Sequence, residues 1–232
     1  MDLAVPASSY IPVPMGYHTC LRLPGTDLAR PYTPIASSFV PMALQEDHGK
    51  KLSFLIKVYQ SGEFTSSLAK LAVGDPLEVS IPDGQFKHHS GESVTSEPEC
   101  ILLCLAAGTG ITPMINLMLH QLYLNRKVVL LWFNKTEKDI AWKEELSRLQ
   151  RSHKNLFKVV NVLSAANMFW EGYRGRITSD ILMKELPPIG NSFTPNTQSF
   201  VCICGPSDFN HLAQRLVTEL GYREENVQIF QG

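Results

Sequence analysis

The sequence predicts two domains: a small antiparallel β-barrel or sandwich over residues 1–92, then an α/β domain with a parallel sheet over residues 93–232. The first observation behind this prediction is that β-rich runs fill the first part of the chain, whereas apolar strand-like runs alternate with helical runs in the second. The second observation is a polar stretch, HHSGESVTSEPE at residues 88–99, which separates the two patterns. A chain of 232 residues is long enough for two small domains.

Composition indicates an ordinary globular protein, with 44% hydrophobic and 19% charged residues and a net charge of -1. This balance excludes a broadly basic surface, so no nucleic-acid partner is expected. The N-terminus lacks the basic start and apolar core of a signal peptide. Residues 100–125 carry no Asp, Glu, Lys or Arg and are long enough to span a membrane. Two glycines and a proline interrupt this run, however, so a strand, a turn and a helix are expected there, and no transmembrane segment.

The cysteines are expected to be reduced and mostly buried. Cys100 and Cys104 share one apolar run, and Cys202 and Cys204 share another. Residues two or four apart on one strand are awkwardly spaced for a disulfide. The same spacings argue against a zinc site, so no metal is expected.

In the first domain, β-rich runs bounded by Gly, Pro, Asp and Ser predict strands at residues 18–23, 51–59 and 75–81. A short helix is expected between the last two strands, at residues 66–71.

In the second domain, five apolar runs predict a five-stranded parallel sheet with helices on both faces. The expected strands lie at residues 100–107, 127–133, 157–163, 198–204 and 227–230. The expected helices lie at residues 115–125, 136–150, 178–186 and 206–220. Thr112 and Thr136 are expected to cap helices, Pro113 to open one, and Gly221 to end the last one in the left-handed conformation. Ligands of such sheets bind at the carboxyl ends of the strands.

Two candidate motifs follow predicted strands of this sheet. GTGITP, Gly108 to Pro113, offers glycines and a helix start that suit a pyrophosphate. Without the last glycine of the dinucleotide pattern it is also compatible with an ordinary strand-to-helix turn. CGPSDF begins at Cys204, which would lie at the crevice, or would be a buried structural cysteine beside a Gly-Pro turn.

Two further motifs lie in the first domain. RPYTP, Arg30 to Pro34, offers a cation for phosphate, an aromatic face and a hydroxyl, or forms a proline-stiffened β-turn. SGEFTSSL, residues 61–68, could hold phosphate on backbone amides, or contain only a helix capped by Thr65 or Ser66. His88 and His89 lie in the polar linker and are expected to be solvated.

Taken in this order, RPYTP, KVY, G-x-x-T-S, AAGTGITPM and CGP resemble the ferredoxin-reductase superfamily. The branch that looks closest is the NADH-cytochrome b5 reductases, in the form fused to a cytochrome b5 module, with the shared phrases FLIKVY, FNKTEKDI and VCICGP. The resemblance covers essentially the whole chain. It implies an FAD-binding β-barrel domain, an NAD(P)H-binding domain, and an enzyme that passes hydride from NADH, or NADPH, to FAD. Single electrons would then leave for a heme protein such as cytochrome b5.

The resemblance also implies roles for particular residues. Two of them, Thr33 near flavin N5 and Cys204 near the nicotinamide C4, would be catalytic. The residues implied to hold FAD are Arg30, Pro31, Tyr32, Thr33, Leu55, Lys57, Tyr59, Phe64, Thr65 and Ser66. The residues implied to hold the pyridine nucleotide are Gly108, Thr109, Gly110, Thr112, Pro113, Tyr173, Gly175, Cys204, Gly205 and Pro206.

The sequence departs from this family pattern in four places. The chain opens near the second barrel strand, so the barrel is expected to be incomplete at its N-terminus, with an exposed edge. No heme-ligand histidine motif is present, so an upstream heme domain of the parent fusion would be missing here. Glu63 and Phe64 stand where glycine and lysine are usual, which removes one cation from the pyrophosphate. Ser164 replaces an acidic residue that contacts the ribose, which predicts NADH use with relaxed exclusion of NADPH.

Two alternatives to this function remain open at the level of the sequence. The chain could be a flavin reductase that passes electrons to oxygen or small acceptors, since such enzymes share every motif. It could also be a non-catalytic nucleotide-binding or interaction fragment of a larger reductase. The family resemblance further implies a location on the cytoplasmic side, in association with the endoplasmic reticulum.

Overall fold

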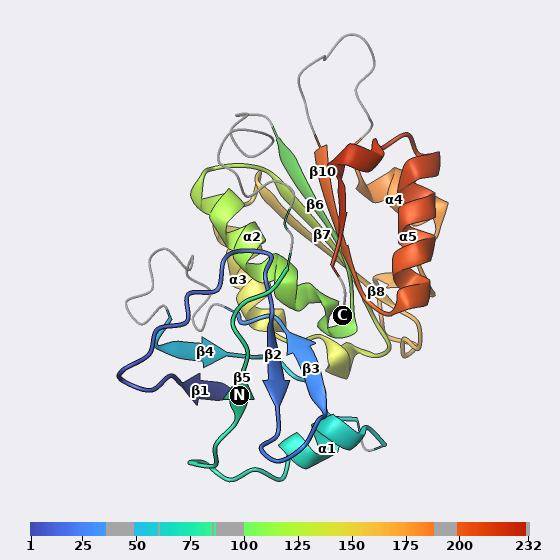
Figure 1. Cartoon of the computed structure of the whole chain (residues 1–232). Helices are drawn as coiled ribbons and strands as arrows, with labels where there is room; N and C mark the ends of the chain where they lie inside the picture. Colours follow the sequence, from blue (N-terminus) through green and yellow to red (C-terminus); the bar gives the residue numbers. More distant parts are fainter. Residues whose placement is uncertain (36–48, 60, 85, 87–99, 188–198, 231–232) are drawn as a thin grey trace.

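A computed structural model describes residues 1–35, 49–59, 61–84, 86, 100–187 and 199–230. Its second half is built around a six-stranded sheet of order β11-β10-β6-β7-β8-β9, in which every pairing is parallel (Figure 1). The strands are β6 (Ile101–Ala107), β7 (Val128–Asn134), β8 (Phe157–Leu163), β9 (Tyr173–Arg174), β10 (Ser199–Cys204) and β11 (Val227–Ile229). The five predicted strands are confirmed, and the two-residue β9 adds a sixth that was too short to predict.

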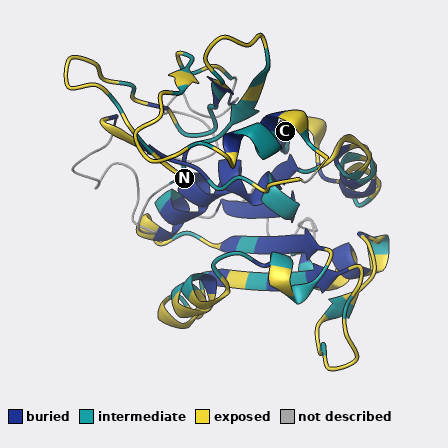
Figure 2. Cartoon of the chain, turned by 90° about the horizontal axis from the view of Figure 1, so that it is seen from below, coloured by how far each residue is buried: buried dark blue, intermediate teal, exposed yellow. Residues whose placement is uncertain are grey.

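Helices cover both faces of this sheet, as the buried runs of its strands require. Side chains of α2 (Thr112–Tyr123) and α3 (Lys143–Ser152) pack on one face. The helices α4 (Ser179–Glu185) and α5 (Ser207–Glu219) lie on the other face (Figure 1), and their side chains pack there. Alternate residues of β6 divide between the two layers: Leu102 and Cys104 face α2, and Leu103 faces α5. Figure 2 shows the buried residues concentrated in this α/β sandwich.

Two details of the predicted helices need correction. Residues 136–150 do not form one helix, because the chain makes a 3-10 turn, η3 (Glu137–Asp139), and then passes through Trp142 at φ 53° before α3. Thr136 does cap that turn, through a capping box with Asp139. Thr112 is the first residue of α2 rather than its cap, because a 3-10 turn, η2 (Gly108–Ile111), precedes it. Pro113 in the first turn and Gly221 at φ 92° are as predicted.

The N-terminal part is antiparallel, as predicted. Its strands β1 (Asp2–Ala4) and β4 (Lys51–Ser53) form one sheet, and β3 (Ala29–Tyr32), β2 (Thr19–Arg22) and β5 (Glu78–Val79) form another. A bridge between Ile35 and Ser53 joins them into an open series, β1-β4-β3-β2-β5, among the described residues. Leu21, Phe54 and Phe64 lie in the core beneath these strands.

Three elements of this part differ in extent from the sequence-based expectation. The predicted strand 75–81 is paired only over Glu78–Val79. The predicted strand 51–59 is paired only over Lys51–Ser53, because residues 54–59 run on along a cleft where no described strand pairs with them. The helix α1 (Glu63–Leu68) begins three residues earlier than predicted, so Thr65 and Ser66 lie inside it and Gly62 is its N-cap. The predicted boundary between residues 92 and 93, and both His88 and His89, fall outside the described residues.

The two parts touch through side chains. The buried Asn116 of α2 donates its side-chain amide to the carbonyl of Pro34 at 3.1 Å. Phe86 packs against Phe200 and Phe230 of the α/β part, with ring centroids 5.9 and 6.0 Å away. Among the described residues, no helix is both long and apolar enough to cross a membrane.

Candidate active site

A cleft of about 740 Å³ lies between the two parts of the chain. One wall comes from β3 and the segment after β4, and the other from the carboxyl ends of β6, β7, β8 and β10. Three segments far apart in sequence therefore share one cavity: Arg30–Thr33, Gly108–Pro113 and Cys204–Pro206. This is the place where ligands of parallel sheets bind.

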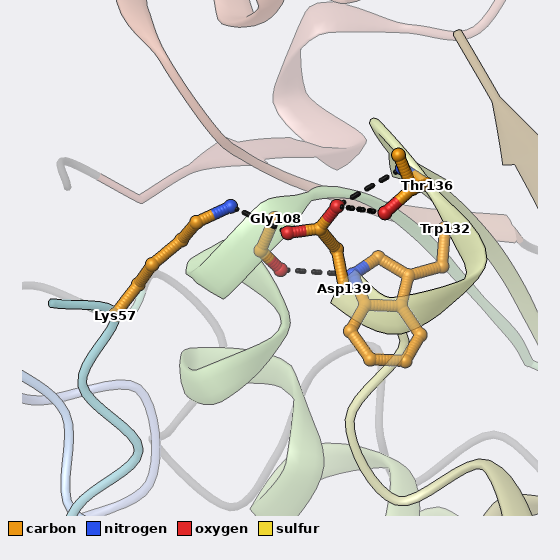
Figure 3. Close-up of polar contacts among 5 residues, drawn as sticks. All are labelled: Lys57, Gly108, Trp132, Thr136 and Asp139. Atoms are coloured by element: carbon orange, nitrogen blue, oxygen red, sulfur yellow. Dashed lines mark hydrogen bonds and ion pairs between the residues drawn. The ribbon is translucent and has the colours of Figure 1, made fainter. Parts of the chain in front are cut away.

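The glycine turn after β6 is packed against the end of β10. A Cβ on Gly110 would lie 2.1 Å from the carbonyl oxygen of Cys204, so only glycine allows the two segments to approach this closely. Gly108 has φ 55°, a conformation that side chains rarely adopt. The Trp132 indole holds the turn from below, because its Nε1–H donates to the Gly108 carbonyl at 2.8 Å (Figure 3). A Cβ on Gly108 would meet no atom within 4 Å, so the turn before α2 leaves room for a phosphate beside the start of the helix.

Cys204 lies at the end of β10 and is only 3% exposed. Burial raises the pKa of its thiol to about 12, so the group is a neutral thiol at pH 7. The following Gly205 has no room for a side chain, since a Cβ there would lie 2.7 Å from the Cβ of Ala107. Cys204 can therefore contact a ligand as a small, weakly polar group but not as a thiolate nucleophile.

The wall from the N-terminal part combines a cation with aromatic faces. The exposed Arg30 guanidinium donates a hydrogen bond to the carbonyl of Ala29 at 2.8 Å, which keeps the side chain beside its own strand. Tyr32 stacks on the buried ring of Phe64, with centroids 5.9 Å apart. Burial raises the pKa of Tyr32, so its phenol stays neutral at physiological pH. The flat ring, supported from behind, can stack on an isoalloxazine. The cation beside it can pair with a diphosphate.

An ion pair connects the two walls. Lys57 Nζ lies 2.8 Å from Oδ1 of Asp139, whose other oxygen accepts from the Thr136 amide at 3.0 Å and from its hydroxyl at 2.7 Å (Figure 3). The hydrogen bond from Lys57 is the largest cause that lowers the pKa of Asp139 to about 2, and Asp139 in turn raises the pKa of Lys57. The pair is charged at any physiological pH.

The charges along the cleft favour an anionic ligand. Arg30, Lys57, Lys135 and Arg176 all line it, whereas Asp208 is the one carboxylate among the described lining residues. At the floor, Asn134 is 7% exposed, and neither polar atom of its side chain has a hydrogen-bond partner in the described part of the chain. A buried unpaired amide is costly, so a polar ligand group at this point would be stabilising.

Comparison with known proteins agrees with this geometry. Residues 1–88 match the oxidoreductase FAD-binding domain, and residues 104–215 match the oxidoreductase NAD-binding domain. NADH-cytochrome b5 reductase 1 of Dictyostelium discoideum is 31% identical over 94% of this chain and 71% of that protein. The chain belongs to the cytochrome b5 reductase family.

Other members of the cytochrome b5 reductase family are more similar but longer. Cytochrome b5 reductase 4 of Mus musculus is 37% identical over 98% of this chain, which spans only 43% of that relative. The solved CS-b5R domains of human Ncb5or are 36% identical, with a TM-score of 0.88 over 99% of this chain and 64% of that one. The ferredoxin-reductase-like fold and the FAD- and NAD-binding oxidoreductase domains of the family are therefore present here.

The cleft brings together nearly all of the residues that the family resemblance implied. Three of them do not line it: Phe64, Ser66 and Tyr173. Phe64 is buried in the core beneath Tyr32, where the apolar ring supports the cleft wall from behind. The hydroxyl of Ser66 donates to the Glu63 carbonyl within α1 at 3.2 Å. The hydroxyl of Tyr173 donates to Glu185 at 2.6 Å.

The remaining implied residues line the cleft, and their binding and catalytic roles stay predictions. Those on the FAD-domain wall are Arg30, Pro31, Tyr32, Thr33, Leu55, Lys57, Tyr59 and Thr65. Those on the NAD-domain wall are Gly108, Thr109, Gly110, Thr112, Pro113, Gly175, Cys204, Gly205 and Pro206. Ser164, identified from the sequence as a departure from the family, also lines it.

Several lining residues were missed by the sequence reasoning, among them Asn134, Lys135 and Arg176. Lys135 follows directly after β7, so the rule that ligands bind at strand carboxyl ends could have identified it. Arg176 could not be found in this way, because the two-residue β9 before it carries no periodic signal.

Proposed function

We propose that this chain passes hydride from NADH or NADPH to FAD and then single electrons to a heme protein such as cytochrome b5. The observation that carries the proposal is one cleft built jointly by the FAD-binding and the NAD-binding domain. The nicotinamide and the isoalloxazine must meet face to face for hydride transfer, and a cavity shared by the two domains allows this. The chain spans less than half of the cytochrome b5 reductase 4 proteins it matches, so the acceptor is inferred from the family alone.

On the FAD side, the residues fit the cofactor's parts. The Arg30 guanidinium would pair with the diphosphate, and the Tyr32 and Tyr59 rings would lie against the flat groups of the cofactor. The hydroxyl of Thr65 accepts from the Tyr59 amide at 3.1 Å, which joins α1 to the segment that carries Lys57 and Tyr59. Glu63 and the buried Phe64 supply no cation here, so Arg30 would provide most of the charge that neutralises the diphosphate.

On the nucleotide side, the glycine turn would lie under the diphosphate of NAD(P)H, with the first amides of α2 behind it. FAD, when bound, would supply the chemistry of the reaction: acceptance of a hydride and release of single electrons. The chain's part is orientation: Pro113, Thr112 and Cys204 form the surface on which the nicotinamide would rest opposite Thr33. The neutral thiol of Cys204 adds no charge to a site through which a hydride passes.

The decisive experiment is expression of the chain with FAD, followed by spectroscopy and acceptor assays. We expect a yellow protein with absorbance at about 450 nm. NADH should bleach this absorbance in the absence of oxygen, and the protein should reduce cytochrome b5. A folded, colourless protein that rejects added FAD would overturn the proposal and favour a non-catalytic fragment. A flavoprotein that reduces oxygen or ferricyanide but not cytochrome b5 would overturn the heme acceptor alone.

Two further proposals rest on the family resemblance. The first is an upstream heme domain in the parent protein, which full-length transcripts of the parent gene would test. The second is a location on the cytoplasmic side of the endoplasmic reticulum, which imaging of the tagged protein would test.

A further inference from the structure

A second pocket, of about 560 Å³, lies at the end of the parallel sheet opposite the cleft. Its walls come from the amino ends of β6, β7 and β8, from the turn that leads from α3 into β8, and from the end of α4. The cleft, by contrast, is built on the carboxyl ends of the same strands. The length of these strands, about 20 Å, separates the two cavities, so a nucleotide held in the cleft does not fill this pocket.

Three cations of this pocket are unpartnered. Lys127, Arg151 and Lys154 line it and are exposed, and none of their side chains has an ion pair or hydrogen bond in the described part of the chain. Arg151 in the last turn of α3 and Lys154 just after it also suit the negative end of the helix dipole. Lys127 precedes β7 and has no such role. Cations from separate elements that face one cavity attract an anionic group.

The acidic residue of the pocket does not cancel this charge. Glu185 is the one carboxylate among the described lining residues. Lys158 Nζ lies 2.5 Å from its Oε2, and the Tyr173 hydroxyl donates to its Oε1 at 2.6 Å. Because Lys158 already compensates Glu185, the other three cations leave the pocket with a net positive charge.

Backbone hydrogen bonds hold two of these cations near each other. The Leu156 amide donates to the His153 carbonyl at 2.9 Å, which closes the turn that carries Lys154. The Leu156 carbonyl in turn accepts from the amide of Val128, the residue after Lys127, at 2.7 Å. The backbones of the turn and of the start of β7 are therefore fixed before any ligand arrives, which lowers the entropic cost of binding.

The pocket also offers apolar side chains beside the cations. Val129, Leu156 and Pro187 line it and are only half-buried, so a ligand could cover them. The volume falls within the range of small-molecule sites, about 300–1,000 Å³, and exceeds what a phosphate group alone would occupy. A ligand that fills the pocket would therefore have an apolar body as well as negative charge.

We propose that this pocket binds a small molecule that carries phosphate groups on an apolar body. A phosphate has about two negative charges and three acceptor oxygens, so Lys127, Arg151 and Lys154 can donate to one or two such groups together. A concave pocket favours a small molecule over the surface of an acidic protein. The inference does not rest on the proposed function, because none of these residues lines the cleft.

The test is calorimetric titration of the chain with geranyl diphosphate and with inorganic pyrophosphate. Saturating FAD and NAD⁺ are present, so that the cleft does not take up either probe. Geranyl diphosphate is expected to bind about tenfold more tightly than pyrophosphate, because its hydrocarbon chain would cover the apolar side chains. The double variant Lys127→Gln with Arg151→Gln should weaken the binding of both probes by about 10- to 100-fold.

Arg148→Gln with Lys184→Gln is the matched control. It removes the same charge from exposed positions on α3 and α4 that do not line the pocket, and it should leave both affinities unchanged. No binding of either probe, or equal losses in the two double variants, would overturn the site. Equal affinity of the wild type for the two probes would overturn the apolar contact.

Discussion

At the scale of single residues, the cleft depends on Arg30 as the only arginine of its FAD-domain wall among the described residues. Arg30→Gln should lower the flavin-to-protein ratio of the purified chain and weaken FAD binding by tenfold or more, because a charge-assisted hydrogen bond contributes about 1.5–3 kcal/mol. Arg22→Gln, on the neighbouring strand and paired with Glu78 outside the cleft, is the control. Wild-type flavin content in the Arg30 variant would contradict the phosphate role.

A second prediction concerns Gly110, at the close approach between the glycine turn and β10. Its substitution by alanine would place a Cβ 2.1 Å from the Cys204 carbonyl oxygen, and neither backbone can give way easily. We expect Gly110→Ala to cost about 1–3 kcal/mol in urea unfolding and to slow flavin reduction by NADH, because the turn must move away from β10. Thr109→Ala changes the same turn without adding an atom. If both variants unfold at the same urea concentration as the wild type, the close approach is not essential.

At this scale the sequence predicted motifs better than it predicted individual contacts. The order of five short motifs identified the residues of both cleft walls, although each motif alone also fitted a turn or a cap. Phe64 and Tyr173 do not line the cleft, because a motif gives the position of a backbone and not the direction of a side chain, and their binding roles stay predictions. Phe64 points into the core and Tyr173 bonds Glu185.

At the scale of elements, the ion pair between Lys57 and Asp139 links the segment after β4 to η3 across the cleft. Asp139→Asn keeps an acceptor for Thr136 but removes the charge, and should destabilise the chain by about 0.5–1 kcal/mol at neutral pH. Because the pKa of Asp139 is lowered to about 2 in the folded state, its contribution is present above about pH 4 and lost as pH falls toward about 2.

The pKa of Lys57 is raised, so its contribution is full below its unfolded pKa and is lost only in strongly alkaline solution. The difference in unfolding free energy between wild type and Asp139→Asn should therefore be constant from about pH 5 to 9 and shrink in acid, as urea titrations would show. Glu137→Gln, whose partner Lys143 lies on the same side of the cleft, is the control. A difference that persists at about pH 2 would contradict the assignment.

Helices and strands were predicted well where one hydrophobic pattern covered the whole element. They were predicted less well where a break lay inside the pattern or the element was very short. The apolar runs of β6, β7 and β10 were placed almost to the residue, because nearly every side chain of these strands is buried and the apolar run ends where the strand ends. The amphipathic pattern from residue 136 to residue 150 concealed a break, since Ile140 is buried and the chain must turn at Trp142 before α3 can begin. β1 and β9, with three and two residues, are too short to carry a period.

At the scale of the whole molecule, FAD should contribute directly to stability, because its cleft is made by both domains. At a concentration about 100-fold above its Kd, a ligand specific for the native state adds about 2.7 kcal/mol, which corresponds to a rise of roughly 5–10 °C in Tm for a chain of this size. Thermal scans with FAD and with riboflavin, which lacks the diphosphate, would measure this. Equal shifts by both compounds would show that the diphosphate contacts contribute nothing.

The two-part architecture followed from composition and pattern along the chain, but the way the parts face each other did not. The contacts that orient them, such as Asn116 with Pro34 and Phe86 with Phe200, join residues with no shared motif and large sequence separations. Physical complementarity of two surfaces is a property of the folded chain, and a local pattern carries no signal for it.

The indole of Trp132 gives the molecule an intrinsic optical reporter. It is 1% exposed, and its N–H is bonded to the Gly108 carbonyl directly beneath the surface where a nucleotide would lie. Its emission should be quenched by energy transfer to a flavin in the same cleft and should change again when the turn shifts. Comparison of ultraviolet-excited fluorescence between the wild type and Trp132→Phe would thus follow ligand arrival without any added dye.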